Sequence, residues 1–523
     1  MAFPQWLCLI IFCHTVLADD WLMGGLNHHG TRNQEDDILN KHNIKDLGVK
    51  WFKRTGLYTF NQPVSKGGYV CFGEFAGGIF QCVNATTNLT IWSTPLIGPV
   101  AGAAVIDGDK LIVCTIAGFC YRKFLENGTT FWTRQMPNPV WSSPLVVGNQ
   151  VIIATNPGEE SGVNFAYMTT QCCSKRGSIH YLNIETGLDN ITPVYQIPVA
   201  SFINVTLPIP NVYQGLNSTT TFLYGPSGGA PWGDFAYSPE LNLIYVCTGQ
   251  AYSPNASGMI PSGVDACFCY DLSGNLIWSE SVRELRGNDI LDIWNSALWW
   301  DPKNPTDVDI GTGPMFYKLT GLERRGRTKY AIAVGDKRGI WYVFDAETGN
   351  CLNHQGYNSL PGVPYPSSNG GYNLQSAGGK FNGRWRSYGN LLSTYSSQIC
   401  NNSGNTNAEC VVFNYAGNFS AHIVAMNGLG TQELDRFTRN ETHFLGGLVL
   451  LDEMLFVRDA FHKKLLVLDA LDLNHILLEL DLSAYLSGVD LGASMMIANG
   501  QVYLGTGIFG SLTTNGLLAL GLP

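Results

Sequence analysis

The sequence predicts an all-β fold, an eight-bladed β-propeller of four-stranded antiparallel blades. Three observations predict it. A short alternating strand pattern that ends in a polar turn recurs about eight times between residues 70 and 520, glycine is abundant at 59 residues, and charged residues make up only 14 % of the chain. Because a single blade cannot bury both of its faces, a repeat of roughly 60 residues predicts a closed ring.

The repeat is clearest in segments 78–84, 177–187 and 339–349. In each segment apolar residues alternate with polar ones after a glycine, which is the period of a β-strand. The last two segments end in Asn/Asp-x-x-Thr-Gly, and this turn needs the positive φ that glycine supplies. Weaker copies begin near Ala117, Asp265, Ser420, Lys464 and Asn515.

Two further patterns predict how the ring is fastened. Residues 47–52 have the composition of a strand, and we expect them to pair with the last blade through residues 502–504 and 517–520. Such pairing hides strand edges that would otherwise recruit other chains. Trp92, Trp132 and Trp278 each follow a blade turn, and we expect them to pack between neighbouring blades.

The chain divides into a secretory signal at residues 1–18, a polar lead-in at 19–50, and a single propeller domain at 51–523. The stretch from Trp6 to Leu17 is apolar but too short to span a bilayer, and Val16-Leu17-Ala18 is a small-residue cleavage site. We find no further apolar stretch long enough for a membrane span. Net charge is −10 without a basic cluster, so the composition argues against nucleic-acid binding.

Cysteines and glycosylation motifs indicate an oxidising compartment. Of the fourteen cysteines, Cys8 and Cys13 fall in the signal, which leaves an even number for disulfide bonds. Asn-x-Ser/Thr sequons, which are N-glycosylation acceptors, occur at Asn84, Asn88, Asn127, Asn190, Asn204, Asn217, Asn255, Asn401, Asn418 and Asn440. The sequence therefore predicts a secreted, extracellular glycoprotein.

Four segments, in this order, carry a resemblance to a known family: 172–178, 231–239, 245–250 and 335–339. The chain resembles the quinoprotein alcohol dehydrogenases, in particular the polyvinyl-alcohol-dehydrogenase-like branch. That resemblance covers nearly all of the mature chain. It implies an eight-bladed propeller that holds pyrroloquinoline quinone (PQQ) and Ca²⁺ in its channel.

The resemblance implies a cofactor site. Adjacent Cys172 and Cys173 look like the pair that forms a disulfide ring against the flat cofactor, although each cysteine would otherwise pair with a distant one. Trp232 is similar to the indole that stacks on the quinone, and Lys337 to the cation beside the quinone oxygens. As alternatives, Trp232 is an ordinary packing tryptophan and Lys337 belongs to a charged hairpin end.

The resemblance also implies metal ligands and a catalytic base. Glu159, Gln250 and Asp292 match the calcium ligands, and Asp292 also matches the general base that takes the alcohol proton. Gln250 departs from the family's asparagine by one methylene, which displaces the amide oxygen. The alternatives are a solvated acidic loop for Glu159 and a turn cap for Asp292.

Two functions follow from these residues. One is a secreted PQQ-dependent dehydrogenase that oxidises a small alcohol; it needs an external electron acceptor, because the chain has no Cys-x-x-Cys-His haem motif. The other is a non-catalytic glycoprotein propeller in an extracellular or mineralised matrix, or one that binds a glycan or protein partner. Segment 378–385, bulkier and more basic than the family's glycine-rich channel motif, favours the second.

Overall fold

The computed structural model describes most of the chain outside its longest loops. It describes residues 20–59, 61–75, 77–157, 175–197, 203–211, 216–224, 228–249, 263–282, 310, 313–319, 328–335, 341–353, 390–395, 410–417, 420–429, 433–440, 448–459, 462–486, 495–507 and 515–523. The predicted signal at residues 1–18 lies outside them.

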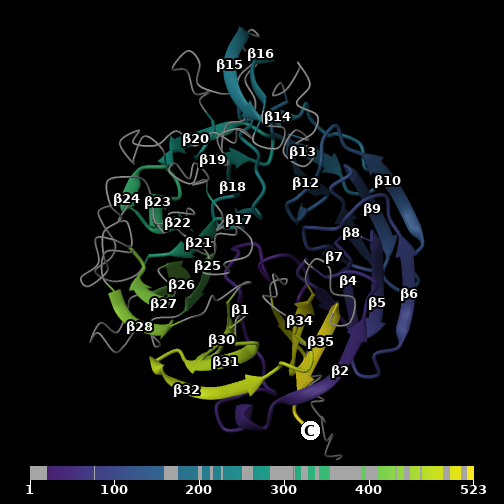
Figure 1. Cartoon of the computed structure of the whole chain (residues 1–523), viewed down its shortest axis with the longest axis vertical. Helices are drawn as coiled ribbons and strands as arrows, with labels where there is room; N and C mark the ends of the chain where they lie inside the picture. Colours follow the sequence, from purple (N-terminus) through teal and green to yellow (C-terminus); the bar gives the residue numbers. More distant parts are fainter. Residues whose placement is uncertain are drawn as a thin grey trace, which may run out of the picture.

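In these residues, seven four-stranded antiparallel sheets and one five-stranded sheet follow one another around a ring (Figure 1). We number the sheets in ring order. Sheet 1 comprises β3 (Val64–Lys66), β4 (Tyr69–Gly73), β5 (Ile79–Asn84) and β6 (Thr90–Pro95). Sheet 2 comprises β7 (Val105–Asp107), β8 (Lys110–Cys114), β9 (Phe119–Phe124) and β10 (Thr130–Gln135). Sheet 3 comprises β11 (Leu145–Val147), β12 (Gln150–Thr155), β13 (Ser178–Asn183) and β14 (Val194–Tyr195).

The hairpin β15 (Ile203–Asn211) and β16 (Leu216–Tyr224) separates sheets 3 and 4. Sheet 4 comprises β17 (Ala236–Ser238), β18 (Leu243–Cys247), β19 (Ala266–Asp271) and β20 (Leu276–Ser281). Sheet 5 comprises β21 (Met315–Lys318), β22 (Tyr330–Gly335), β23 (Trp341–Asp345) and β24 (Cys351–Asn353). Sheet 6 comprises β25 (Asn390–Tyr395), β26 (Cys410–Gly417), β27 (Ser420–Asn427) and β28 (Glu433–Asn440).

Sheet 7 is the five-stranded one. It comprises β29 (Val449–Leu451), β30 (Met454–Asp459), β31 (Lys464–Asp469) and β32 (Asp472–Asp481), and β1 (Asn33–Gln34) joins β29 in parallel. Sheet 8 comprises β33 (Met496–Ala498), β34 (Gln501–Thr506), β35 (Gly516–Gly521) and β2 (Gly48–Arg54). A single turn of 3-10 helix, η1 (Ile44–Asp46), precedes β2. The predicted propeller of four-stranded antiparallel sheets is confirmed.

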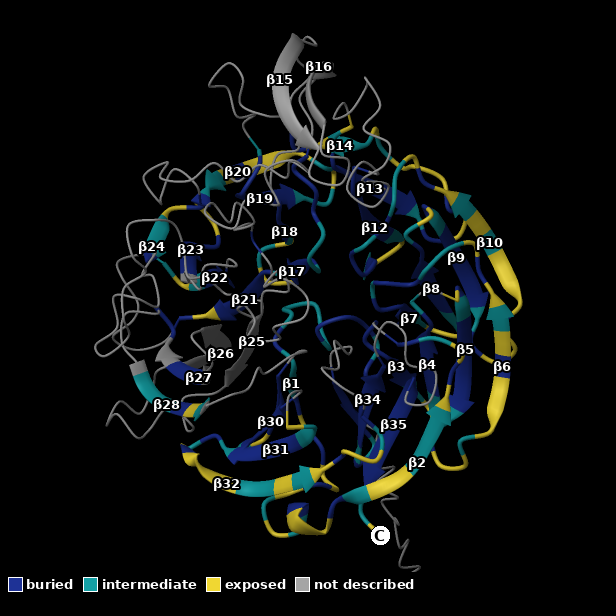
Figure 2. Cartoon of the chain, in the orientation of Figure 1, coloured by how far each residue is buried: buried dark blue, intermediate teal, exposed yellow. Residues whose placement is uncertain are grey.

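Middle strands whose side chains are described form the core, because both of their faces pack against neighbouring sheets. In β12, for example, Val151, Ile152 and Ile153 are all fully buried. Continuous apolar runs of this kind are typical of strands covered on both sides. The fourth strands lie on the rim and are largely exposed, as β6 and β10 show in Figure 2.

Tryptophans from the rim strands lock neighbouring sheets together, as the sequence predicts. The Trp92 indole N–H of sheet 1 donates to the Leu125 carbonyl oxygen of sheet 2 at 2.7 Å. A Cβ on Gly128, in the same turn, would lie 2.5 Å from the Trp92 ring, so the turn needs glycine for packing as well as for its φ of +70°. Trp132 donates likewise to Ile184, and Trp278 to Ala346.

Closure of the ring follows the sequence in part. Strand β2 pairs with β35 in the register Trp51↔Ala519 and Phe52↔Leu518, as predicted. Residues 502–504, in β34, instead pair with the opposite edge of β35. The prediction that residues 502–504 pair directly with the N-terminal strand is wrong, because β35 lies between β34 and β2.

Residues 20–36, which we call the central segment, bind the innermost strands. Backbone N–H groups of Ile106 (β7), Tyr237 (β17), Phe316 (β21) and Leu450 (β29) donate to carbonyl oxygens of the segment at 2.6–3.0 Å. Trp21 exchanges two backbone hydrogen bonds with Ser65 in β3, His28 Nε2 lies 2.9 Å from the Val146 carbonyl oxygen in β11, and Asp36 accepts from the Gly500 N–H. The central segment therefore binds seven of the eight described sheets.

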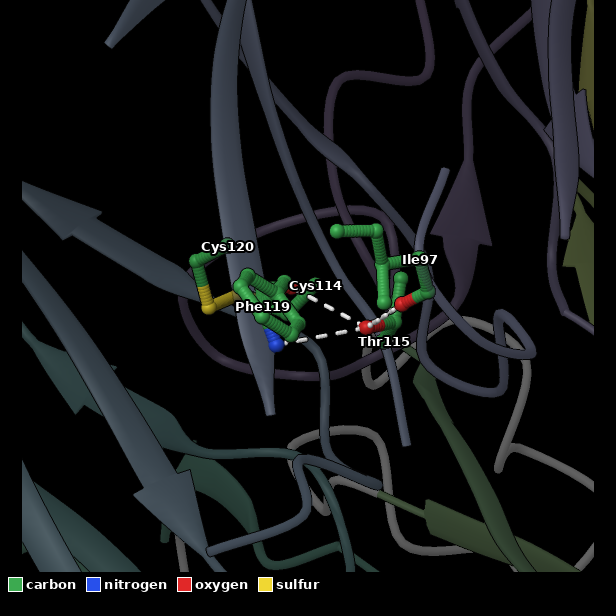
Figure 3. The surroundings of a disulfide bond; sticks show 5 residues. All are labelled: Ile97, Cys114, Thr115, Phe119 and Cys120. Atoms are coloured by element: carbon green, nitrogen blue, oxygen red, sulfur yellow. Dashed lines mark hydrogen bonds between the residues drawn. A yellow bond between two sulfur atoms is a disulfide. The ribbon is translucent and has the colours of Figure 1, made fainter. Parts of the chain in front are cut away.

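Among the described residues, three disulfide bonds join the second and third strands of their sheets. They are Cys71–Cys82 in sheet 1, Cys114–Cys120 in sheet 2 and Cys247–Cys267 in sheet 4. In each pair the cysteines lie directly opposite one another, with Cα atoms 4.0–4.1 Å apart. Figure 3 shows Cys114–Cys120, beside which the Thr115 hydroxyl donates to the Ile97 carbonyl oxygen at 2.7 Å.

The described residues contain no helix of sufficient length and apolar character to cross a bilayer.

An ion pair between sheets 6 and 7 predicts a pH effect on stability. Glu479 in β32 accepts hydrogen bonds from Arg439 at 3.1 and 3.2 Å and also contacts Lys464. These cations, Arg439 first, lower the pKa of Glu479 from 4.5 to about 2. Because the pKa is lowered by folding, the stabilisation is complete above pH 4.5 and is lost as the pH falls toward 2.

Glu479 is partly exposed, so solvent limits the effect to about 0.5–1 kcal/mol. We expect Glu479→Gln to lower the free energy of unfolding by that amount at pH 6 and to make no difference near pH 2. Urea unfolding at several pH values measures this, with the exposed Glu347→Gln as control. A Glu479→Gln deficit that persists unchanged at pH 2 would contradict the electrostatic origin.

Candidate functional site

The predicted site residues fall in connections at one end of the ring. In a four-stranded antiparallel sheet, the connection from the second to the third strand and the connection from the fourth strand to the next sheet emerge at the same end. We call this the site end, and the opposite one the turn end. Connections of these two kinds contain Glu159, Cys172, Cys173, Trp232, Gln250, Asp292 and Lys337.

Of these seven residues only Trp232 is described by the structure; the other six lie outside the described residues. Trp232 is half-buried in the stretch that leads into β17. Two residues later, the Asp234 carboxylate accepts a hydrogen bond from the Ser143 N–H at 3.2 Å and lies 3.7 Å from Arg32 of the central segment.

Backbone contacts bring the flanks of three predicted segments together. The Gly177 N–H donates to the Gly228 carbonyl oxygen at 3.0 Å, the Gly228 N–H donates to Lys175 at 3.2 Å, and the Gly249 N–H donates to Ala230 at 2.9 Å. We call these residues, together with Gly229, the glycine junction.

Close approach explains the glycines of the junction. A Cβ on Gly177 would lie 2.3 Å from the Gly229 carbonyl oxygen, so no larger residue fits there. Because consecutive Cα atoms are about 3.8 Å apart, the junction limits how far Cys173, two residues before Lys175, and Gln250, next to Gly249, can lie from it.

Orphaned polar atoms lie at the same end. Asn156 directly follows β12, three residues before Glu159, and is only 1 % exposed. Neither atom of its side-chain amide has a hydrogen-bond partner, and the same is true of Asn61 Nδ2, Thr59 Oγ1, Trp141 Nε1 and Asn515 Oδ1. Buried polar groups are normally paired, so these atoms are suited to hydrogen bonds with a polar ligand or ordered water. This donor and acceptor set fits a polar cofactor such as PQQ.

Aromatic rings border these atoms. The Tyr58 and Phe75 ring centroids are 5.0 Å apart, and those of Phe75 and Trp141 are 6.1 Å apart. Beside them Glu74 is 6 % exposed and accepts a hydrogen bond from the Gly56 N–H at 3.2 Å. Burial raises the pKa of Glu74, so its carboxyl group resists ionisation more than a surface glutamate does.

Sequence reasoning missed Asn156, Glu74 and Trp141. The only feature of the sequence that could have found them is their position in the repeat, since Glu74 and Asn156 directly follow the second strands of their sheets. Among the described residues no group of three or more His, Cys, Asp or Glu side chains could hold a metal ion. The three predicted metal ligands all lie outside those residues.

The two ends of the central segment contact the turn end. The Asp20 carboxylate accepts from the Gly67 N–H at 2.9 Å, and the Asp36 carboxylate accepts from the Gly500 N–H at 2.7 Å. Gly67 and Gly500 belong to turns between first and second strands, which lie at the turn end. The middle of the segment instead contacts site-end connections, because the Gly25 N–H donates to the Gln62 side-chain oxygen at 3.0 Å and Arg32 lies 3.7 Å from Asp234.

Comparisons with known proteins agree with this fold. No family model matches the chain. It is 22 % identical over 365 residues to a quinohemoprotein alcohol dehydrogenase of Pseudomonas putida, which is 65 % of this chain and 48 % of the relative. It is 23 % identical over 359 residues to the polyvinylalcohol dehydrogenase of a Pseudomonas species, 63 % of this chain and 50 % of the relative.

The chain therefore spans about half the length of these curated relatives. A solved europium-containing methanol dehydrogenase superposes with a TM-score of 0.65 at 15 % identity, over 96 % of this chain and 98 % of that one, which shows the shared propeller fold. The chain is a distant homologue of the PQQ-dependent alcohol and methanol dehydrogenases.

Proposed function

We propose that the chain is a secreted, extracellular eight-bladed propeller that binds PQQ with Ca²⁺ at the site end and oxidises an alcohol. In this proposal sheet 7 counts as a blade despite its additional strand, and electrons leave to an external acceptor. The relatives are alcohol dehydrogenases, and one similar solved structure is a europium-containing methanol dehydrogenase.

The glycine junction is the observation that carries the proposal. It joins residues 228–230, which lead to Trp232, to the described flanks of the connections that contain the Cys172–Cys173 pair and Gln250. These residues come from three separate connections of the chain, and the sequence resemblance assigns all of them to one cofactor. A backbone cross-link among those connections is what a shared site requires.

When bound, PQQ supplies an oxidising quinone and Ca²⁺ supplies a Lewis acid. The chain's own residues then have simple tasks. Trp232 offers a flat indole face to a planar ring, and Lys337 offers a cation to carbonyl oxygens. The Asp292 carboxylate takes the proton from the alcohol hydroxyl, and Glu159 and Gln250 supply oxygen ligands to the cation.

The test is reconstitution of the full chain, secreted from a eukaryotic host, with PQQ and Ca²⁺. Calorimetry measures binding, and reduction of an artificial dye measures turnover over a panel of alcohols. We expect Asp292→Asn to lower turnover by about 10²–10⁴-fold because the general base is lost, while PQQ still binds. Trp232→Ala should weaken PQQ binding about tenfold through lost stacking.

Asp109→Asn serves as the matched control, because Asp109 is exposed in a turn at the opposite end of the ring. It should leave both binding and turnover unchanged. Failure of the folded protein to bind PQQ would refute the proposal. Such a result would leave the non-catalytic propeller, and immobilised glycans and matrix proteins would then be the next ligands to test.

A further inference from the structure

Exposed apolar side chains recur at the rim of sheets 1, 2 and 3. Leu89, Phe131 and Leu188 are 68 %, 41 % and 58 % exposed, each in or just after the turn between the third and fourth strands. The fourth strand of a propeller sheet is its outer edge, and an exposed apolar edge favours association with other chains. Figure 2 shows that two of these outer strands, β6 and β10, are largely exposed.

Sequons occur in the same three turns. Asn84 ends β5 and Asn88 lies in the turn that follows it in sheet 1, Asn127 lies in the turn of sheet 2 and Asn190 in that of sheet 3. Sheet 4 has exposed Leu276 and Ile277 on β20 but no sequon in its turn, so it provides an internal comparison.

Asn127 has the most favourable local geometry of these sequons. It is exposed, and its side-chain carbonyl oxygen accepts hydrogen bonds from the Thr129 N–H at 2.9 Å and from the Thr129 hydroxyl at 2.7 Å. Thr129 is the hydroxyl residue of the sequon. Both bonds use the carbonyl oxygen, so they leave the amide nitrogen, the atom that N-glycosylation modifies, available.

Asn84 differs from Asn127 both in exposure and in its hydrogen bonds. It is half-buried, and its carbonyl oxygen binds the hydroxyl and N–H of Thr87, whereas the sequon hydroxyl belongs to Thr86. Asn88 has a positive φ of 60°, and its side-chain oxygen is buried without a partner. The turn of sheet 1 thus uses its asparagines for local structure.

We propose that Asn127 carries an N-linked glycan whose sugars cover the exposed face of β10, including Phe131. The proposal rests on the proposed secretion. The donor is a lipid-diphosphate-linked oligosaccharide: the bond between the sugar C1 and the diphosphate oxygen breaks, the Asn127 Nδ2–C1 bond forms, and the amide proton leaves to a base. Phe131 lies four residues along the chain from Asn127, and at about 3.3 Å per residue the two are at most roughly 13 Å apart.

The test uses the full chain expressed in a eukaryotic secretory host in two arms, one with its own residues 1–18 and one with an unrelated secretion leader in their place. Mass spectrometry of the peptide containing Asn127, before and after enzymatic removal of glycans, measures occupancy. We expect occupancy at Asn127, its loss in Asn127→Gln and Thr129→Ala, and its retention in Thr129→Ser. Thr87→Ala, which leaves every sequon intact, is the matched control.

Hydroxyl-radical footprinting then measures whether the sugars cover the exposed face of β10. Oxidation of Phe131 should rise several-fold in Asn127→Gln, while that of Ile277 in β20 stays constant. An unmodified Asn127 in the chain secreted by the unrelated leader overturns the proposal, and so does unchanged Phe131 oxidation. If the chain is secreted with the unrelated leader but not with its own residues 1–18, the proposed secretion is refuted. Occupancy of Asn127 is then still measured in the arm with the unrelated leader.

Discussion

Replacing Trp21 by alanine is expected to lower the free energy of unfolding by about 3–5 kcal/mol, the usual cost of a large aromatic side chain removed from a core. Trp21 is fully buried, although it belongs to a polar N-terminal stretch. It packs in the hydrophobic core that joins sheets 1, 7 and 8, with Phe72 and Phe456 among its members. Its backbone also exchanges two hydrogen bonds with Ser65.

Urea unfolding followed by tryptophan fluorescence and circular dichroism measures the change. Trp21→Phe separates ring burial from hydrogen bonding: the Trp21 indole N–H has no partner, so phenylalanine should retain most of the stability. Leu276→Ala, at a 54 % exposed position, should change stability by less than about 0.5 kcal/mol. Equal losses in Trp21→Ala and Leu276→Ala would contradict a structural role for the central segment.

Removal of the three disulfides is expected to have the second large effect. The bonded residues are 11, 6 and 20 positions apart, so loop-closure entropy predicts about 2–3 kcal/mol for each bond, with Cys247–Cys267 the most stabilising. Because whole domains are stable by only about 5–15 kcal/mol, serine substitution of all six cysteines should leave little folded protein. Unfolding curves of three variants, each with one cysteine pair replaced by serines, measure how much each disulfide bond stabilises the protein.

Sheet 3 supplies the control for this prediction. Its directly opposed Thr155 and Ser178 share a hydrogen bond of 2.7 Å between buried hydroxyls. Their double alanine variant should destabilise the protein whether or not a reductant is present. Each cysteine double variant should instead have the same free energy of unfolding as the parent chain once the disulfides of the parent are reduced. A difference in stability that survives reduction would contradict the disulfide origin.

Strand repeats and wedge tryptophans could be predicted because they depend on local patterns. Alternation of apolar and polar residues followed by a polar turn specifies a hairpin, and a tryptophan soon after that turn has the same role in sheets 1, 2 and 4. The disulfide pairs could have been predicted from a local pattern of the same kind. Cys114 and Cys120 stand equally far from their hairpin turn, and paired residues in a hairpin do so by geometry.

The contacts of the central segment could not be predicted in this way. Its bonds are made by backbone groups of an aperiodic polar stretch, and Arg32 meets Leu450 more than four hundred residues away. Of the candidate site, the structure describes the backbone bonds of the glycine junction, which join the flanks of three of the connections that contain predicted residues. The predicted roles of Glu159, Cys172, Cys173, Gln250, Asp292 and Lys337 stay predictions, because these residues lie outside the described part of the chain.

The central segment also determines when this protein can finish folding. Residues 20–36 leave the ribosome before any of the sheets, yet the Leu450 and Gly500 N–H groups that they bind are synthesised on the order of a minute later. Until then the inner strands of the early sheets bind one end of a segment whose other end has no partner. Contacts of such long sequence separation slow folding and prolong exposure to aggregation. Synthesis of this chain should therefore depend on chaperones that shield its first sheets until the last strand arrives.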